Sequence, residues 1–168
     1  MLTVDRLPDT RVSTADAVAV TPVCLLAAVV VGAWFGDLVG LPVAPWVALP
    51  LGVAAAGPVV LGLWRGAAPD RAGVAVWGIV TAITLALLLA WAWPTLLPLG
   101  SGPDLVHHLA LIRYIETHRS LVHDSGAERW LGEMVSYTPG SHLLAVIGGP
   151  LAGLGGGRGV HALVALAV

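Results

Sequence analysis

The chain has 168 residues, of which 57% are hydrophobic and 11% charged, and its net charge at pH 7 is −2. Soluble domains carry about 25% charged residues, so this composition excludes an ordinary water-covered domain. The lack of a basic patch excludes nucleic-acid binding. We therefore predict an all-α, polytopic integral membrane helical bundle with the lipid bilayer as its solvent, because helices satisfy their backbone hydrogen bonds within lipid.

Residues 1–16 form the first predicted segment, a cytoplasmic N-terminal tail in which Asp and Arg are mixed. The tail lacks the positive region of a signal peptide, so we expect it to be retained. Three transmembrane helices are then predicted within residues 17–99, separated by the charged positions. Each apolar run is long enough for a bilayer core that needs about 20 residues. The second run contains four prolines, which predict a kinked or broken helix.

Residues 100–137 form a polar loop that holds four of the six His, with a fifth at His142, and half of the ten acidic residues. Such a length exceeds what a connection between two spans needs, and long loops are often functional. Ser101 as N-cap and Pro103 in the first turn predict an amphipathic helix that ends near His118 and lies along the membrane interface. Asp104, His107 and His108 then share one face of this helix, because they are three and four residues apart.

Three roles are open for this face. Asp oxygen and His nitrogen atoms could bind a divalent metal. Asp104 could act as a general base that deprotonates a hydroxyl group. Alternatively, Asp104 caps the helix and both His residues fill the interface without any chemistry.

Residues 138–168 are predicted to contain a fourth transmembrane helix, opened by Pro139, and the start of a fifth. His142 lies about one turn inside the fourth helix, and an ionisable group at that depth suggests function. The ten residues after Arg158 reach about 15 Å, half of the core. We therefore expect the sequence to stop in mid-span, as the N-terminal part of a longer protein would.

The distribution of Arg predicts the orientation in the cell membrane. Five Arg residues fall in the tail, after the second span and after the fourth, whereas the loop after the first span has none. A cytoplasmic N-terminus places all five inside, as the positive-inside rule requires. The loop 100–137 then faces outward.

The order of these features resembles the first module of C-type membrane glycosyltransferases, which take sugars from polyprenyl-phosphate carriers. In that family, an acidic residue follows a span directly, and a Tyr-x-Pro-Pro-Leu-like motif opens the next span. Asp104 matches the acid and the sequence YTPGSHLL, which begins at Tyr137, matches the motif, with Gly140 in place of the second Pro. The resemblance covers about residues 75–155, although in the family this loop usually follows the first span.

The resemblance implies roles for five residues. Asp104 would be the catalytic base or would position a metal ion. His107, His108 and His142 would contact the metal or the donor phosphate, and Tyr137 would line the groove for the polyprenyl-phosphate sugar. A second interpretation is a non-catalytic membrane subunit of a transporter or assembly complex, in which the loop contacts further membrane helices or subunits.

Overall fold

The structure of the protein, a computed structural model, describes residues 12–92, 103–151, 153 and 155. Every element named within these residues is helical, so the all-α prediction is confirmed for the described part of the chain. The elements are α1 (Thr14–Leu38), α2 (Pro45–Gly66), α3 (Arg71–Ala92), α4 (Pro103–His118), η1 (Ser125–Ala127), α5 (Glu128–Leu131), η2 (Gly132–Ser136) and α6 (Gly140–Leu151). The predicted start of a fifth membrane helix, residues 159–168, lies outside the described residues.

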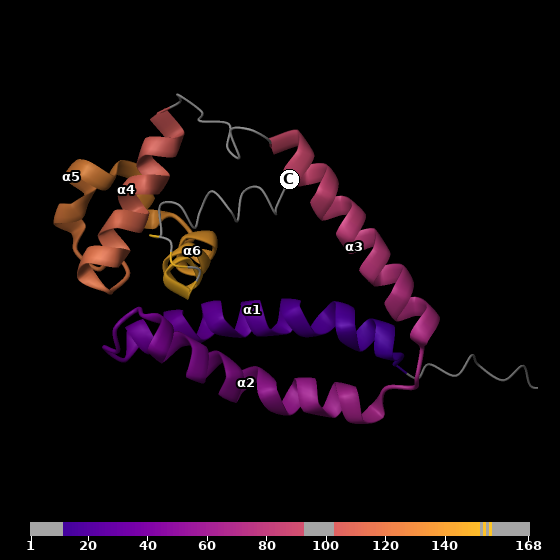
Figure 1. Cartoon of the computed structure of the whole chain (residues 1–168). Helices are drawn as coiled ribbons and strands as arrows, with labels where there is room; N and C mark the ends of the chain where they lie inside the picture. The colour runs from indigo at the N-terminus through magenta and orange to yellow at the C-terminus, as the bar shows by residue number, and fades with distance from the viewer. Residues whose placement is uncertain (1–11, 93–102, 152, 154, 156–168) are drawn as a thin grey trace, which may run out of the picture.

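Helices α1 and α2 lie side by side as an antiparallel pair (Figure 1). Their contact is close because glycines face it. A Cβ atom added to Gly52 would lie 2.6 Å from Cγ2 of Val29, and one added to Gly32 would lie 3.1 Å from Cβ of Leu51. Small residues at such positions let two helix backbones approach, which increases van der Waals contact. Helices in lipid associate in this way, because lipid provides no hydrophobic driving force between them.

Within the described residues, two helices, α1 and α2, are long and apolar enough to cross a membrane. Within the most apolar window of each helix, 11% of α1 and 17% of α2 is buried inside the protein. Helices of a soluble core would bury most of such a surface, whereas these helices present it outward. Their length, composition and exposure therefore favour a membrane protein.

Helix α2 is one continuous helix, although the sequence predicted a kink or a break. Pro45 is its first residue, a position where the missing N–H has no helical partner. Pro50 and Pro58 lie inside the helix and do not end it. The break that these prolines could cause does not occur, because packing against α1 holds the helix together.

The N-terminal end of α1 is tied to the connection between α2 and α3. The Thr14 N–H donates to the Ala68 carbonyl oxygen at 2.9 Å, and the Asp70 N–H donates to Oγ1 of Thr14 at 2.8 Å. Helix α3 starts from this point and runs away from the α1–α2 pair (Figure 1). Among the described elements, α3 packs against α1 alone.

Residues 103–151, here called the cap, form a compact unit beside the opposite end of α1 and α2 (Figure 1). Most of its apolar side chains face inward, as in a water-soluble core, although Val106, Trp130 and Leu151 are exposed. Ile112 of α4 is 1% exposed, so it packs inside the cap and does not face the membrane interface along which the sequence predicted this helix to lie. The largest fully buried apolar side chains of the cap are Leu111, Ile112, Ile115, Leu131 and Leu143.

Asp37, in the last turn of α1, joins the cap to the long helices. Its side chain is buried, and Oδ1 accepts a hydrogen bond from the Leu121 N–H at 2.9 Å. Its Oδ2 lies 2.7 Å from Nε2 of His123. Beside this contact, the Val43 N–H donates to the Arg119 carbonyl oxygen at 2.6 Å. We call these contacts the Asp37 seam.

At Arg119, directly after α4, the backbone turns, and this turn leads the chain to the Asp37 seam. Its φ angle is 53°, in the left-handed region that often follows the last turn of a helix. Glycine usually occupies such a position, because a side chain there is strained. The Arg119 guanidinium lies 4.8 Å from the ring centre of Trp46, so a cation–π contact with α2 compensates part of the cost.

Candidate functional site

Helix α4 carries the acidic and imidazole groups that the sequence identified. It begins at Pro103 and ends at His118, in agreement with the prediction. Asp104 is its second residue, and the side chain of Asp104 lies outside the described part of the structure. His107 and His108 follow one turn later, and both are half-buried.

Helix α6 brings His142 to α4. Pro139 precedes the helix and cannot extend it backwards, so α6 begins at Gly140 and His142 falls in its first turn. The His142 side chain is 1% exposed, which makes it one of the largest fully buried side chains in the described chain. A buried imidazole needs polar partners, because an unpaired polar group away from water costs about 1–3 kcal/mol.

The partner of His142 is His108. Nδ1 of His108 lies 2.9 Å from Nε2 of His142, and the two rings are stacked with an interplanar angle of 23°. A hydrogen bond between two imidazole nitrogens needs one N–H and one lone pair, so the two facing atoms hold a single proton. On its other side, Nδ1 of His142 lies 3.4 Å from Oγ of Ser141. The result is a short polar chain from α6 to α4.

Tyr137 completes an aromatic cluster around this imidazole pair. Its ring lies edge-on to His108, with 5.2 Å between ring centres, and edge-on to His142 at 5.5 Å. Edge-to-face contacts of this kind each stabilise by about 0.5–1.5 kcal/mol. Tyr137 is 46% exposed, so the cluster reaches the surface of the cap through this residue.

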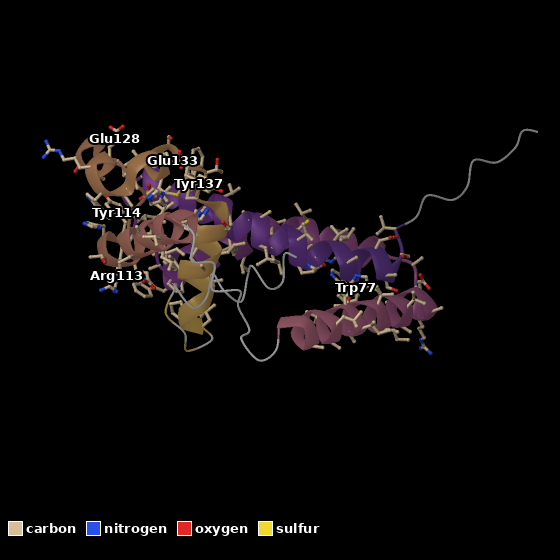
Figure 2. All side chains as sticks on the ribbon, turned by 90° about the horizontal axis from the view of Figure 1, so that it is seen from above. Trp77, Arg113, Tyr114, Glu128, Glu133 and Tyr137 are labelled. Carbon is tan, nitrogen blue, oxygen red and sulfur yellow. The ribbon has the colours of Figure 1, made fainter. Side chains whose placement is uncertain are left out.

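A pocket of about 360 Å³ opens beside the cluster. Its volume lies near the lower end of the range of about 300–1,000 Å³ that small-molecule sites occupy. Figure 2 shows Glu133 and Tyr137 together on the cap, with Glu128 further out. The residues that line the pocket are His108, Glu133, Met134, Ser136 and Tyr137.

Within the described residues, no three His, Cys, Asp or Glu side chains gather closely enough to hold a metal ion. The imidazole pair supplies two nitrogen ligands at most, and a stable site for a divalent metal needs more. The divalent metal that the sequence suggested therefore stays a prediction, which depends on groups such as Asp104.

No protein-family model, curated protein or solved structure matches this chain. The likeness to C-type glycosyltransferases therefore rests on the residues themselves.

The structure brings together three of the five residues that the sequence singled out: His108, Tyr137 and His142. His107 is the neighbour of His108 in α4 and does not belong to this aromatic cluster. Asp104 lies one turn before His108 along the same helix. The catalytic and binding roles of all five residues remain proposals.

The sequence did not identify the Asp37 seam or three residues of the pocket wall, Glu133, Met134 and Ser136. Asp37 is one of the charged positions that separate the predicted spans, and a carboxylate at the end of a span needs a partner. Such a partner cannot be found from spacing, because His123 is 86 positions away. Glu133 had been grouped with the charged loop residues, and Ser136 precedes Tyr137 directly, so its place beside the motif was the available signal.

Proposed function

We propose that this chain is a multi-pass protein of the cell membrane, with a cytoplasmic N-terminus, that acts as part of a glycosyltransferase. Its donor would be a sugar carried on polyprenyl phosphate at the outer face. The observation that carries the proposal is a pocket of the cap lined by His108 and Tyr137, with the buried His142 in contact with both, beside the ends of apolar helices. The headgroup of a lipid-linked sugar needs a polar pocket near the membrane surface. The pocket must lie next to an apolar helix surface along which the polyprenyl chain can lie.

Two sets of contacts support the topology. The α2–α3 connection lies at the N-terminal end of α1, whereas the cap lies at the C-terminal end of α1, on Asp37. The chain travels between these two ends through α3, a helix of 22 residues and about 33 Å. A third crossing by α3 explains this path, and α6 would start a fourth from the cap. With the N-terminus inside, the pocket then faces outward, as a donor at the outer face requires.

Cross-linking would test this proposal. A photoreactive short-chain polyprenyl-phosphate hexose is added to membranes that contain the full chain, and labelled peptides are identified by mass spectrometry. We expect labels within residues 103–118 or 132–147, and we expect excess unmodified carrier to suppress them. Labelling should fall at least about fivefold in His108→Ala, since a lost polar contact of about 1 kcal/mol has that effect.

His118→Ala is the matched control for the His108 variant. Both residues belong to α4, but His118 stacks on Tyr114 away from the pocket, with its Nδ1 3.0 Å from the Tyr114 carbonyl oxygen. Labelling of His118→Ala should equal that of the unchanged protein. Labelling spread evenly over α1–α3, without suppression by excess carrier, would refute the donor proposal.

In a sugar-transfer assay, Asp104→Asn should abolish transfer while membrane insertion stays normal.

One observation favours a second function, a non-catalytic subunit of a membrane complex. Helix α3 contacts only α1 among the described elements, and its large apolar side chains point outward. Lipid covers such a surface, and so does a partner helix. If cysteine cross-linking in the membrane joins the outward face of α3 to another protein and the donor probe labels nothing, this second function is preferred. The most exposed of these side chains are Val76, Ile79, Val80, Ile83 and Leu87.

A further inference from the structure

The chemistry of the pocket wall restricts what part of a substrate fits there. Glu133 contributes a carboxylate and Ser136 a hydroxyl group, and the described lining contains neither Arg nor Lys. Proteins bind phosphate with cations or with clustered N–H donors, and a carboxylate repels an anion. A phosphate group is therefore a poor occupant of this pocket.

Hydroxyl groups, in contrast, match the acceptors in the wall. Within the described part of the chain, the Glu133 carboxylate has no hydrogen-bond or ion-pair partner. An ionised carboxylate accepts several O–H donors, and hydrogen bonds to it are stronger than those between neutral groups. The Ser136 hydroxyl donates to the Glu133 carbonyl oxygen at 3.1 Å, so its lone pairs are directed toward further donors.

Tyr137 adds a flat apolar surface to the pocket wall. Its ring meets the two imidazoles edge-on and remains 46% exposed at the pocket. A ring fixed in this manner offers a flat surface to the apolar face of a ligand at little cost in conformational entropy. Carboxylate, hydroxyl and aromatic ring together suit a ligand with many hydroxyl groups and one apolar face.

We propose that the pocket binds an uncharged, hydroxyl-rich ring, a hexopyranose unit, through Glu133, Ser136 and Tyr137. This inference rests on the proposed function and makes it more specific, because it assigns the sugar to the pocket and directs the phosphate elsewhere. On this proposal, Glu133 and Ser136 determine the specificity of the pocket for a sugar ring over a phosphate group.

The test uses the full chain in phosphatidylcholine nanodiscs, which contain no sugar headgroup. Methyl α-D-glucopyranoside and methyl α-D-mannopyranoside are the neutral probes, and glucose 1-phosphate and inorganic phosphate are the anionic ones. Affinities come from saturation-transfer NMR titrations. We expect at least one glycoside to bind more tightly than both anions, and Tyr137→Ala to weaken it at least about fivefold.

Glu133→Gln should change the affinities for glycoside and for glucose 1-phosphate in opposite directions. Loss of the charge should weaken glycoside binding about fivefold, because a charged acceptor becomes neutral, and should strengthen glucose 1-phosphate binding, because repulsion disappears. Glu128→Gln is the matched control, an exposed acid five positions earlier that does not line the pocket, and it should change neither affinity. Circular dichroism should show equal helix content in all variants.

The inference is overturned if neither glycoside binds, if phosphate binds more tightly than the glycosides, or if Glu133→Gln and Glu128→Gln behave alike. These failures differ from failure of the donor proposal. Labelling by the polyprenyl-phosphate probe without glycoside binding rejects the sugar pocket alone. Glycoside binding that is sensitive to Glu133, without any labelling, rejects the lipid-linked donor and leaves a sugar site on the membrane surface.

Discussion

The three long helices and the cap use apolar residues in opposite ways. In α1, α2 and α3, Val31, Val59 and Val76 are at least 60% exposed, whereas Leu111 and Ile112 in the cap are at most 2% exposed. Both regions are helical, so secondary structure does not distinguish them. The difference is the one expected between helices in lipid and a unit in water, since lipid accepts apolar side chains on a helix surface and water drives them inside.

Different interactions also hold each of the two regions together. Helices α1 and α2 approach closely at Gly32 and Gly52, as helices in lipid do, where apolar side chains gain nothing by leaving lipid for protein. The cap is held by burial of large side chains, and burying one Leu or Ile fully stabilises by about 1.5–3 kcal/mol. Between them lies the Asp37 seam, where hydrogen bonds connect an apolar helix end to a polar loop.

The largest expected effect concerns which side of the membrane each region occupies. Single cysteines at Gly66 and Glu128, in a Cys24→Ser background, are treated with a maleimide that cannot cross membranes. Both positions are exposed in the structure. We expect Glu128→Cys to react in intact cells and Gly66→Cys to react only after permeabilisation, since the positive-inside rule places Arg65 and Arg71 in the cytoplasm. The reverse pattern would refute the proposed orientation and an outward-facing pocket.

The second effect concerns the Asp37 seam. Asp37→Ala removes a buried acceptor of two hydrogen bonds, from Leu121 and His123. We expect the free energy of unfolding of the cap to fall by about 2–4 kcal/mol, because hydrogen bonds to charged groups contribute about 1.5–3 kcal/mol each. Faster amide exchange at Leu121 and Val43 would measure the loosening. His123→Gln should lose less than about 1 kcal/mol, because the His123 side chain is 59% exposed.

Asp124→Asn provides the control for Asp37→Ala. Its carboxylate accepts a hydrogen bond from the N–H of Gly126, two residues away, and does not touch α1. Exchange at Leu121 should therefore remain unchanged. If Asp37→Ala and Asp124→Asn loosened the cap equally, the seam would not be what holds the two regions together.

The third effect concerns the close contact within the long helices. Gly52→Ala places a Cβ atom 2.8 Å from Cα of Val29, so the backbones of α1 and α2 must separate. Overpacking of this kind costs about 1–3 kcal/mol. Gly57→Ala, in the same helix with nothing within 4 Å, should be neutral or slightly stabilising. Thermal unfolding in nanodiscs distinguishes the two variants, and equal effects would mean that close packing does not join these helices.

The smallest effect concerns the imidazole pair inside the cap. His142→Phe keeps a buried aromatic ring but removes the hydrogen bond to Nδ1 of His108. We expect a loss of about 1 kcal/mol in the free energy of unfolding. The 15N chemical shift of His108 Nδ1 should also change, which a merely steric effect would not produce. His118→Phe, at an exposed position, should change the stability by less than about 0.5 kcal/mol.

The sequence by itself favoured a membrane environment and determined the local helices of this protein. Asp16 lies in the first turn of α1 and Asp37 in its last, and the apolar run between them favours a helix in lipid. Helix α4 ends at His118 as predicted, and α6 begins directly after Pro139, because capping and proline signals act over a few residues. The sequence GAWFG at residues 32–36 also contains the small-residue spacing of the α1–α2 contact.

Tertiary structure alone decided which polar groups meet. His108 and His142 are separated by 34 positions, and Asp37 and His123 by 86, so no periodicity connects them. These pairs form because the cap folds around its buried apolar side chains and docks on the end of α1, which forces its buried polar groups to find partners. Helical period and turn chemistry act locally, whereas the pairing of buried polar groups depends on how whole elements pack.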